Sequence, residues 1–540
     1  MSSLTRSPDP AGDPSPPGTE RMSPVDTAWL RMEELSNQMT ITAVLTVGAP
    51  LAMTDLRRVL RERFLLFDRF RQRVRRGRSY QRPRWEPDPD FDLDRHLHAV
   101  RLPAPAGKAE LQKRASALMS RPLDFSRPLW QFYLIENYAE GAALIARLHH
   151  CIADGFTLVR VLLSLTDRAP DASRGGVPDD DLAGAFPGKR DDGRPDDGRP
   201  DNALPSSGGQ RVVSALRAVG KKSARGAELL ARGAGVLGKL VGAASDPGTS
   251  LRGELGPRKK AVWSEPVPLA DVKAAGRALG GTVNDVLMTA MTGALRRYLR
   301  ERGELSAGDS REDLRAVVPV NLRPLGEAPL TMGNGFGLVF LPLPVGLADP
   351  EARLAELRRR MDRLKRSPEA AVLLGILGAV GAGPPAVQDR IVSYLARKVT
   401  AVATNVPGPQ QKLYLAGAPL ETIMAWVPKA GRVGLGISII SYDGDVRLGL
   451  AADAGLVPDP EALLAGFRRE FDALRSRVPG VPEDEADAPR VESGEAERAR
   501  GSSDAAEAGP DRCQATTQAG TQCKLPAQDG ARFCHVHQED

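Results

Sequence analysis

The chain has few of the residues that would place it among disulfide-rich or nucleic-acid-binding proteins. Its 540 residues include four cysteines and six histidines, and three of the cysteines lie between residues 511 and 540. This distribution excludes a disulfide framework and favours a reducing compartment. The net charge of +6 is small for this length, so nucleic acid is not an expected partner.

Long apolar segments are also missing. Residues 1–20 are rich in Pro, Ser, Asp and Gly and contain no apolar core, so they do not form a signal peptide. Two uncharged stretches, residues 328–348 and 370–388, are interrupted by glycines and prolines before they provide the roughly 20 apolar residues that a membrane-spanning helix needs. We therefore expect a cytoplasmic protein that is not integral to a membrane.

The chain does contain ample material for a core, since 41% of its residues are hydrophobic. Its length suggests about three domains. Segments rich in Gly, Pro and charge cannot build a core and are interpreted as disordered. The predicted organisation is a disordered N-terminus (1–21), a first α/β half (22–170), a disordered linker (171–210), a basic amphipathic helix with a crossover (211–262), a second α/β half (263–478), an acidic disordered linker (479–510) and a small tail (511–540).

Two adjacent histidines, His149 and His150, begin an HHxxxDG pattern that ends at Asp154 and Gly155. The apolar residues before the pattern predict a buried strand, and those after it predict a helix. Histidine can accept and return a proton near neutral pH, so we interpret His150 as a general base. Gly155 is expected to close a tight turn. The alternative is a buried histidine pair satisfied by backbone groups, with Asp154 only capping the next helix.

Other motifs follow the same order as in a known family. These are Ser23-Pro24-Val25-Asp26 to Trp29, Pro128-Leu129-Trp130, Asn284-Asp285, residues 318–324 (VPVNLRP), Gly333-Asn334 and residues 404–409 (TNVPGP). With HHxxxDG they resemble the wax ester synthase/diacylglycerol acyltransferase family, within the CoA-dependent acyltransferase superfamily. The resemblance covers Met22 to about Arg477.

This resemblance implies an α/β fold of two chloramphenicol-acetyltransferase-like domains with the active-site tunnel between them. It implies an O-acyltransferase that moves a long-chain fatty acyl group from acyl-CoA to diacylglycerol or a long-chain alcohol, forming triacylglycerol or wax ester. It also implies that catalysis needs no cofactor and that the enzyme associates peripherally with a membrane or lipid droplets. The sequence does not reveal the preferred acceptor or the acyl-chain length.

The resemblance also assigns roles to residues. His149 and His150 form the catalytic pair, and Asn284 is the candidate donor to the oxyanion, with local help from Asp285. The alternative for Asn284 is a cap on the helix that follows it. Asp154 and Arg323 are predicted to pair and, with Gly155, to support the histidine loop.

Two further residues near the motifs need an interpretation. Trp130 is interpreted as a large core residue beside the site, where it could contact substrate without taking part in the chemistry. Cys151 occupies a spacer position of HHxxxDG, so a thiol nucleophile is disfavoured. His96 and His98 are interpreted as edge-strand residues, because no third metal ligand lies near them in the sequence.

Two other kinds of function remain open. One is a condensation-type acyltransferase that uses another acceptor or a carrier-bound donor. The other is a non-catalytic lipid-binding or tethering protein that kept the fold. The complete motif set counts against the first, and the intact His149, His150 and Asn284 count against the second.

Residues 211–245 are predicted to form a basic amphipathic helix. The segment holds one acid, Glu228, and seven basic residues: Arg211, Arg217, Lys221, Lys222, Arg225, Arg232 and Lys239. Such a helix can lie on an anionic membrane surface. A solvated helix packed on the enzyme explains the same pattern equally well.

The tail contains Cys513, Cys523, Cys534 and His537 with the spacing C-x9-C-x10-C-x2-H. Three thiolates and one imidazole suit a tetrahedral zinc site. The spacing is similar to the small WRC-type CCCH zinc motif, whose plant examples bind DNA. An unstructured tail with free cysteines is the alternative, and the sequence identifies no partner for the tail.

Overall fold

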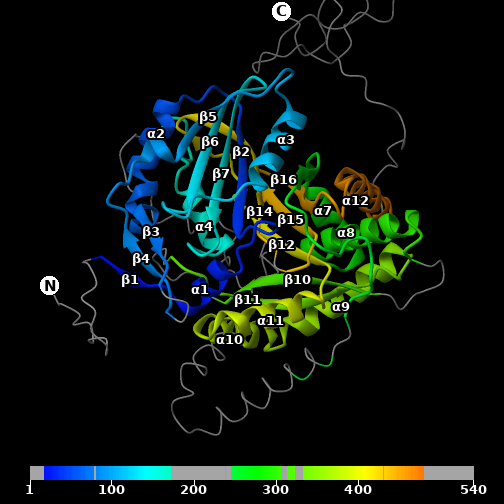
Figure 1. The fold of residues 1–540 in the computed structure, drawn as a ribbon. Coiled ribbons are helices and arrows are strands. Elements are labelled where there is room, and N and C mark those ends of the chain that lie inside the picture. The colour runs from blue at the N-terminus through cyan, green and yellow to red at the C-terminus, as the bar shows by residue number, and fades with distance from the viewer. Residues whose placement is uncertain are drawn as a thin grey trace, which may run out of the picture. The chain divides into compact units, whose positions relative to one another are not determined.

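Two β-sheets, each covered by helices, form the body of the protein (Figure 1). The computed structural model describes residues 18–77, 81–171, 245–305, 313–322, 332–429 and 431–478, together with residues 238 and 242. The whole tail and nearly all of the predicted disordered segments and of the predicted basic helix lie outside these residues. At the end of the predicted disordered N-terminus, Glu20–Arg21 instead form strand β1, because they pair with β4.

The first sheet has six strands in the order β13-β14-β2-β7-β6-β5. Its central strands β2 and β7 are buried along their whole length, and apolar residues predominate in both, although β2 also buries threonines and β7 buries Arg147. The pairs are antiparallel except that of β5 with β6. The strands are β2 (Thr40–Val47), β5 (Leu97–Val100), β6 (Trp130–Tyr138), β7 (Gly141–His149), β13 (Tyr414–Leu415) and β14 (Ala418–Trp426).

The second sheet has seven strands, with β11-β10-β12-β15-β16-β8 in order and β9 also paired to β16. Parallel pairs join β10 to β12 and β12 to β15, and the other pairs are antiparallel. The strands are β8 (Lys259–Trp263), β9 (Val267–Pro268), β10 (Leu314–Asn321), β11 (Phe336–Leu343), β12 (Ala401–Pro407), β15 (Leu435–Tyr442) and β16 (Asp445–Asp453). A small third sheet contains β1 (Glu20–Arg21), β4 (Arg84–Pro87) and β3 (Gln72–Arg75).

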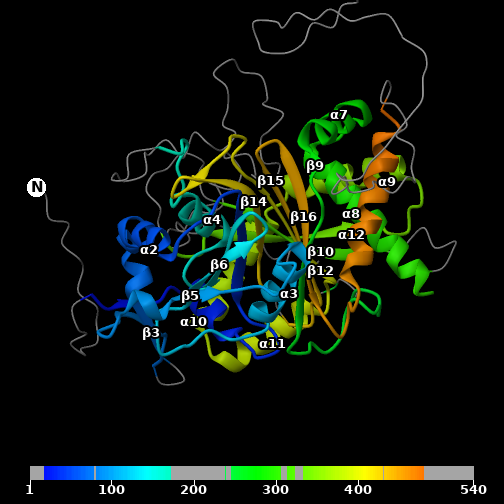
Figure 2. The ribbon, with the colours of Figure 1, turned by 90° about the horizontal axis from the view of Figure 1, so that it is seen from above.

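The second half contributes two strands to the first sheet, so the two sheets are not separate along the sequence. Strands β13 and β14 come from the second half, yet β14 pairs antiparallel with β2 in the first sheet. The predicted boundary at residue 263 also falls at the end of β8, which belongs to the second sheet. One apolar cluster unites side chains of both sheets, including Ile145, Met424 and Ile440. Figure 2 shows β14 crossing toward the first sheet from the side of β15 and β16.

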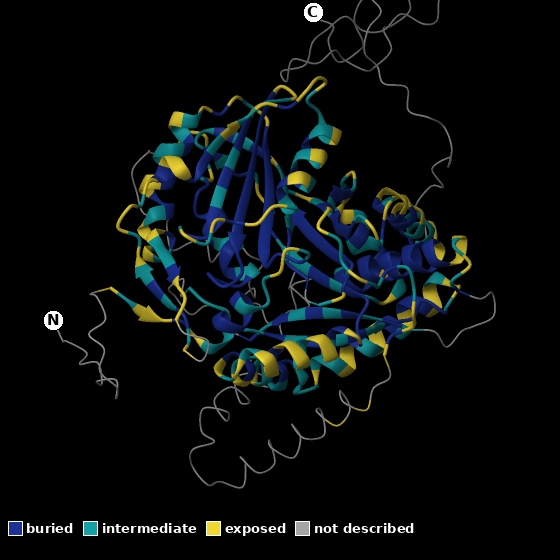
Figure 3. Ribbon diagram, viewed as in Figure 1, coloured by how far each residue is buried: buried dark blue, intermediate teal, exposed yellow. Residues whose placement is uncertain are grey.

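Helices cover the outer faces of the sheets (Figure 3). Helix α8 lies almost completely buried against the second sheet, whereas α10 and α11 are partly exposed. The helices are α1 (Pro24–Arg31), α2 (Met53–Glu62), α3 (Lys108–Met119), α4 (Gly155–Leu163), α7 (Leu269–Leu279), α8 (Val283–Glu301), α9 (Pro350–Lys365), α10 (Glu369–Ala382), α11 (Pro385–Ala396) and α12 (Pro460–Arg475).

Helix α10 is fixed at both ends. A Cβ at Gly337 would lie 2.2 Å from Ala370 O, so glycine lets the start of α10 approach strand β11. The carboxylate of Glu369 accepts the Phe340 backbone N–H at 2.7 Å, which satisfies a donor on this edge strand. A Cβ at Gly381 would lie 1.8 Å from Pro24 O, so glycine also permits close contact with α1.

The apolar stretch at residues 370–388 is divided as the sequence predicted. Helix α10 ends at Ala382, and α11 begins at Pro385. Among the described residues, no helix is both long enough and apolar enough to cross a membrane.

Candidate active site

The histidine motif lies where strand β7 meets helix α4. Strand β7 ends at His149, and α4 begins at Gly155 with Asp154 as its N-cap. The Asp154 Oδ1 atom accepts the backbone N–H of Thr157 at 2.8 Å. The predicted order of strand, loop and helix is therefore confirmed, and Asp154 does cap the helix.

The reason predicted for Gly155 is wrong. Gly155 is the first residue of α4 and is absent from the glycines with positive φ. A Cβ at this position would lie 3.4 Å from Val427 Cγ1, which is an ordinary van der Waals distance. Neither the backbone angle nor the space beside the pocket therefore requires glycine here.

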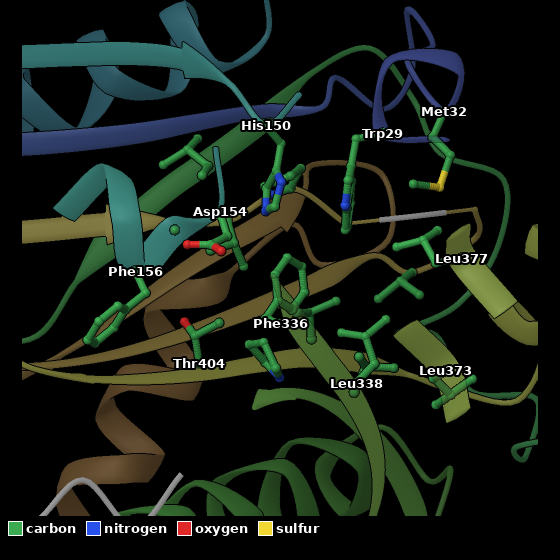
Figure 4. Close-up of a pocket in the computed structure, with 18 of the residues that line it drawn as sticks. Trp29, Met32, His150, Asp154, Phe156, Phe336, Leu338, Leu373, Leu377 and Thr404 are labelled. Carbon is green, nitrogen blue, oxygen red and sulfur yellow. The ribbon is translucent and has the colours of Figure 1, made fainter. Parts of the chain in front are cut away.

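The His150 side chain is buried in the wall of the pocket. Its ring stacks on Trp29 with centroids 4.1 Å apart, and the Phe336 ring lies 5.6 Å away. Figure 4 shows the imidazole directed into the pocket between Trp29 and Asp154. Burial lowers the pKa of His150 to about 4, although the nearby Asp154 carboxylate opposes this shift. The imidazole is therefore neutral near pH 7 and can accept a proton.

His149 lies outside the residues that line this pocket. Its Nδ1 accepts the Cys151 backbone N–H at 3.1 Å, so the neutral ring carries its proton on Nε2. That Nε2 lies 3.4 Å from Glu33 Oε2, but the pair lacks hydrogen-bond geometry. The hydrogen bond fixes the ring within the loop, and the catalytic part predicted for His149 stays a prediction.

Cys151 is fully buried and is also absent from the pocket lining. Burial raises the pKa of its thiol, with the Asp26 carboxylate adding to the shift. A thiol held neutral in this way is a poor nucleophile, which agrees with its interpretation as a spacer residue.

A loop of the second half fixes the histidine loop of the first. The Gly335 backbone N–H donates to Asp154 Oδ2 at 3.0 Å. The Asn334 Nδ2 donates to both His150 O and Asp26 Oδ1, each at 2.8 Å. The predicted partner of Asp154, Arg323, lies outside the described residues, so that pair stays a prediction.

Three of the sequence motifs meet at these bonds. Asp26 belongs to the first motif, His150 to HHxxxDG and Asn334 to the Gly-Asn motif. Burial raises the pKa of Asp26, and hydrogen bonds from Ser23 and Asn334 oppose the shift. The motifs thus connect the two halves around the base.

The Asn-Asp motif lies at the start of α8. Thr282, not Asn284, caps this helix, and Asp285 completes a capping box with Thr282. The Asn284 Oδ1 accepts from Asn405 Nδ2 at 3.0 Å. Asn405 lines the pocket, whereas Asn284 does not. The oxyanion role of Asn284 stays a prediction, and the cap proposed as its alternative belongs to Thr282.

Trp130 is a core residue. It is completely buried, and its Nε1 donates to Phe70 O at 2.8 Å. Its ring stacks on His96 with centroids 4.2 Å apart. Since Trp130 does not line the pocket, the substrate contact considered for it has no support here, and its core role explains its position. His98 lies on the edge strand β5, as predicted, whereas His96 precedes that strand and caps the short 3-10 helix Leu93–Arg95.

The pocket is an apolar slot of about 240 Å³ between the second sheet and helices α10 and α11. Every second residue of three strands faces it, because side chains alternate along a strand. The register of the strands aligns these residues in three rows across β10, β11 and β12. The row nearest His150 contains Asn321, Phe336 and Val406. The middle row contains Pro319, Leu338 and Thr404, and the farthest row contains Val317, Phe340 and Val402. Leu373, Ile376, Leu377 and Val380 of α10 form part of the opposite wall.

Sequence reasoning missed several parts of this site. It gave Trp29 and Asn334 no role beyond membership in motifs, and it did not identify Phe336 or the wall formed by α10 and α11. The motif pattern marked the first two positions. Their function depends on contacts across the two halves, which sequence spacing does not report.

No group of three or more His, Cys, Asp or Glu residues in the described ranges could hold a metal ion. The predicted zinc ligands Cys513, Cys523, Cys534 and His537 lie beyond residue 478, outside those ranges. The zinc site stays a prediction.

Comparisons with known proteins agree with this geometry. A model of the wax ester synthase/diacylglycerol acyltransferase catalytic domain matches residues 22–287, and one of the C-terminal domain of the same family matches residues 332–475. A probable diacylglycerol O-acyltransferase of Mycobacterium tuberculosis is 30% identical over 456 residues, covering 83% of this chain and 94% of that protein.

Solved structures show the same fold. A wax ester synthase/diacylglycerol acyltransferase from Marinobacter aquaeolei superposes with a TM-score of 0.59 at 20% identity, covering 85% of this chain and 99% of that chain. The first condensation domain of the calcium-dependent antibiotic synthetase gives 0.55 at 16% identity, covering 85% and 96%.

This chain therefore has the α/β fold of these two structures. At the level of sequence, the chain belongs to the wax ester synthase/diacylglycerol acyltransferase family.

Proposed function

We propose that the protein transfers a long-chain acyl group from acyl-CoA to the hydroxyl of diacylglycerol or a long-chain alcohol, which forms triacylglycerol or wax ester. The observation that carries this proposal is a buried, neutral histidine, His150, at one end of an apolar slot. The slot suits the hydrocarbon part of a lipid, and the histidine suits the proton transfer that its hydroxyl needs.

The reaction follows from these groups. His150 accepts the proton of the acceptor hydroxyl, and the oxygen attacks the thioester carbonyl. The tetrahedral intermediate expels the CoA thiolate, which leaves readily because a thiol has a pKa of about 8.5. The imidazolium then returns the proton to the thiolate. The acyl group passes directly between the two substrates, without an acyl-enzyme.

The test of this function is thiol release from palmitoyl-CoA with diolein or hexadecanol as acceptor. Release that depends on the acceptor, together with ester product in the lipid extract, would support the proposal and rank the two acceptors. Release that is independent of both acceptors, or none from a folded protein, would contradict it.

The length of the slot should limit the chain that it accepts. Four residues of β10 separate Val317 from Asn321, which is about 13 Å at about 3.3 Å per residue. An extended hydrocarbon chain with bonds of about 1.5 Å at about 111° needs about ten methylene groups to span that length. Val402 lies in the row farthest from His150.

Val402→Phe is therefore expected to lower kcat/KM for 16-carbon chains about tenfold or more and to change it little for 8-carbon chains, because lost contacts of about 1.4 kcal/mol correspond to tenfold. The measurement is thiol release across a series of acyl-CoA and alcohol lengths. Leu66→Phe is the matched control, since Leu66 is 57% exposed and does not line the slot. An equal loss at all lengths would contradict the assignment.

We also propose that the enzyme associates peripherally with a membrane or lipid-droplet surface through α10 and α11. Between Glu369 and Asp389 the chain carries no charged residue, although α10 and α11 are partly exposed. Val387 and Tyr394 are exposed apolar residues of α11, and the inner face of the pair lines the slot. A lipid surface there would present acceptor beside the pocket.

The combined variant Val387→Asp and Tyr394→Asp should reduce flotation with phosphatidylcholine vesicles that contain diolein, because it places charge where apolar side chains meet lipid. Leu66→Asp is the matched control, since Leu66 is 57% exposed and lies elsewhere in the chain. Flotation equal to that of wild type would reject α10 and α11 as the contact surface.

A further inference from the structure

The orientation of the Asn334 amide is fixed by its hydrogen bonds. Its Nδ2 donates to the carboxylate of Asp26 and to the backbone oxygen of His150. A carbonyl oxygen and an ionised carboxylate only accept, so a flipped amide would place oxygen against both. The hydrogen-bond network therefore decides which end of this amide faces Asp26.

Two buried atoms beside this network lack hydrogen-bond partners among the described residues. They are Asn334 Oδ1 and His150 Nδ1. A buried polar atom without a partner costs about 1–3 kcal/mol, so each atom favours a complementary neighbour. Oδ1 can only accept, whereas Nδ1 donates when it carries a proton.

The two side chains also interact electrostatically. Burial lowers the pKa of His150, while the Asn334 side chain and the backbone oxygen of His150 itself act to raise it. Groups that raise the pKa of an imidazole are those that stabilise a proton on the ring. Both of these groups involve Asn334. One is its own side chain, and the other is the backbone oxygen of His150, which accepts from Asn334 Nδ2.

We propose that Asn334 is a positioning residue that holds His150 in the tautomer with its proton on Nδ1, so that the Nε2 lone pair is free to act as the base. In the opposite tautomer, Nδ1 and the Asn334 oxygen would both be acceptors, so neither buried atom could satisfy the other. The inference deepens the proposed function, because it assigns the state in which His150 works. Since Asn334 comes from the second half and His150 from the first, the tautomer depends on contact between the halves.

Asp26 holds the Asn334 side chain in this orientation. Its Oδ1 also accepts the Asn334 backbone N–H at 3.1 Å. The Asp26 backbone N–H is held by the Ser23 hydroxyl at 3.1 Å, which caps helix α1. The Arg69 guanidinium favours the ionised form of Asp26 electrostatically. Asp26 thus keeps the amide nitrogen on its own side and leaves Oδ1 for the ring.

The test is nitrogen NMR of the full chain labelled with 15N-histidine, in which the chemical shifts of the two ring nitrogens report the tautomer. The chain has six histidines, and the His150→Gln spectrum identifies the signals of His150. Wild type should show the Nδ1–H tautomer. Asn334→Ala should give a mixture and lower kcat about 10–100-fold, as expected for the partner of a functional histidine, with KM within about twofold.

Asn334→Asp separates the hydrogen-bond acceptor of the Asn334 side chain from its hydrogen-bond donor. It keeps an acceptor for Nδ1–H but loses both donated bonds, so it should retain the tautomer that Asn334→Ala loses. Asn137→Ala is the matched control, because the Asn137 amide pairs with backbone groups of Leu102 away from the pocket. It should leave the tautomer and kcat unchanged.

A wild-type spectrum with the proton on Nε2 would overturn the inference, even if no variant folded. An unchanged tautomer in folded Asn334→Ala would also overturn it. The proposed function fails by a different result, namely acceptor-dependent transfer that persists in His150→Ala. The two failures can therefore be told apart.

Discussion

His150→Ala is expected to lower kcat/KM for acceptor-dependent thiol release about 10³-fold. A general base contributes roughly 10²–10⁴-fold, and this histidine is the titratable base on the slot wall beside Asp154. A 10³-fold loss corresponds to about 4 kcal/mol of barrier. The measurement is steady-state thiol release from palmitoyl-CoA with the better acceptor.

His98→Gln is the matched control for this variant. His98 lies on the edge strand β5 and stacks on Tyr133, so its loss should leave the rate within about twofold, as for an ordinary surface-side change. Equal rates for His150→Ala and His98→Gln would show that His150 is not the base. Equal far-ultraviolet circular dichroism spectra would confirm that both variants are folded.

The pH dependence of kcat/KM should reflect the protonation of His150. Because burial lowers the pKa of His150 to about 4, kcat/KM should stay flat from about pH 5 to 8 and fall only as the imidazole protonates below that.

The free energy of unfolding should also depend on the protonation of His150. The unfolded histidine has a pKa of about 6.5, so the unfolded state binds the proton first and the folded state loses stability as pH falls from about 6.5 toward 4.

Asp154→Asn is expected to lower the free energy of unfolding by about 3 kcal/mol. The carboxylate accepts one backbone N–H from Thr157 and another from Gly335 of the second half. An asparagine can accept with its oxygen only, so one of these buried donors would face an amide nitrogen. Hydrogen bonds to charged groups are worth about 1.5–3 kcal/mol each. Denaturant unfolding monitored by tryptophan fluorescence measures the loss.

Asp349→Asn provides the comparison. Asp349 caps α9 through the Ala352 backbone N–H at 2.8 Å, but it is exposed and contacts no part of the active site. Its substitution should cost about 1 kcal/mol or less, as for an ordinary helix cap. If Asp154→Asn were as stable as wild type yet slow, Asp154 would have a direct part in the chemistry instead of a supporting one.

The sequence predicted the secondary structure around the histidine motif well, because local pattern decides it there. Strand β7 is a continuous apolar run, and α4 begins where Asp154 can cap it. Strand β14 was missed. Its sequence, APLETIMAW, mixes proline, charge and apolar residues without a clear period, and its pairing with β2 stabilises it as a strand. That partner lies more than 370 residues away.

The sequence did not distinguish the two histidines of the motif. It grouped His149 with His150, because adjacent histidines look alike in one dimension. Successive residues of a strand point to opposite sides, and the structure accordingly directs His149 to Cys151 and Glu33 while His150 faces the slot. Asn284 likewise reaches the pocket only through its bond to Asn405.

By itself, the sequence determined the family and the α/β class and singled out His150, because short motifs and apolar periodicity are local properties. The tertiary structure decided what surrounds that histidine. The stacked Trp29, the amide of Asn334 and the slot wall of α10 and α11 reach the surroundings of His150 from segments up to 246 residues away. Contacts of this kind set the pKa of His150 and the shape of the slot, since burial and hydrogen bonding depend on neighbours in space.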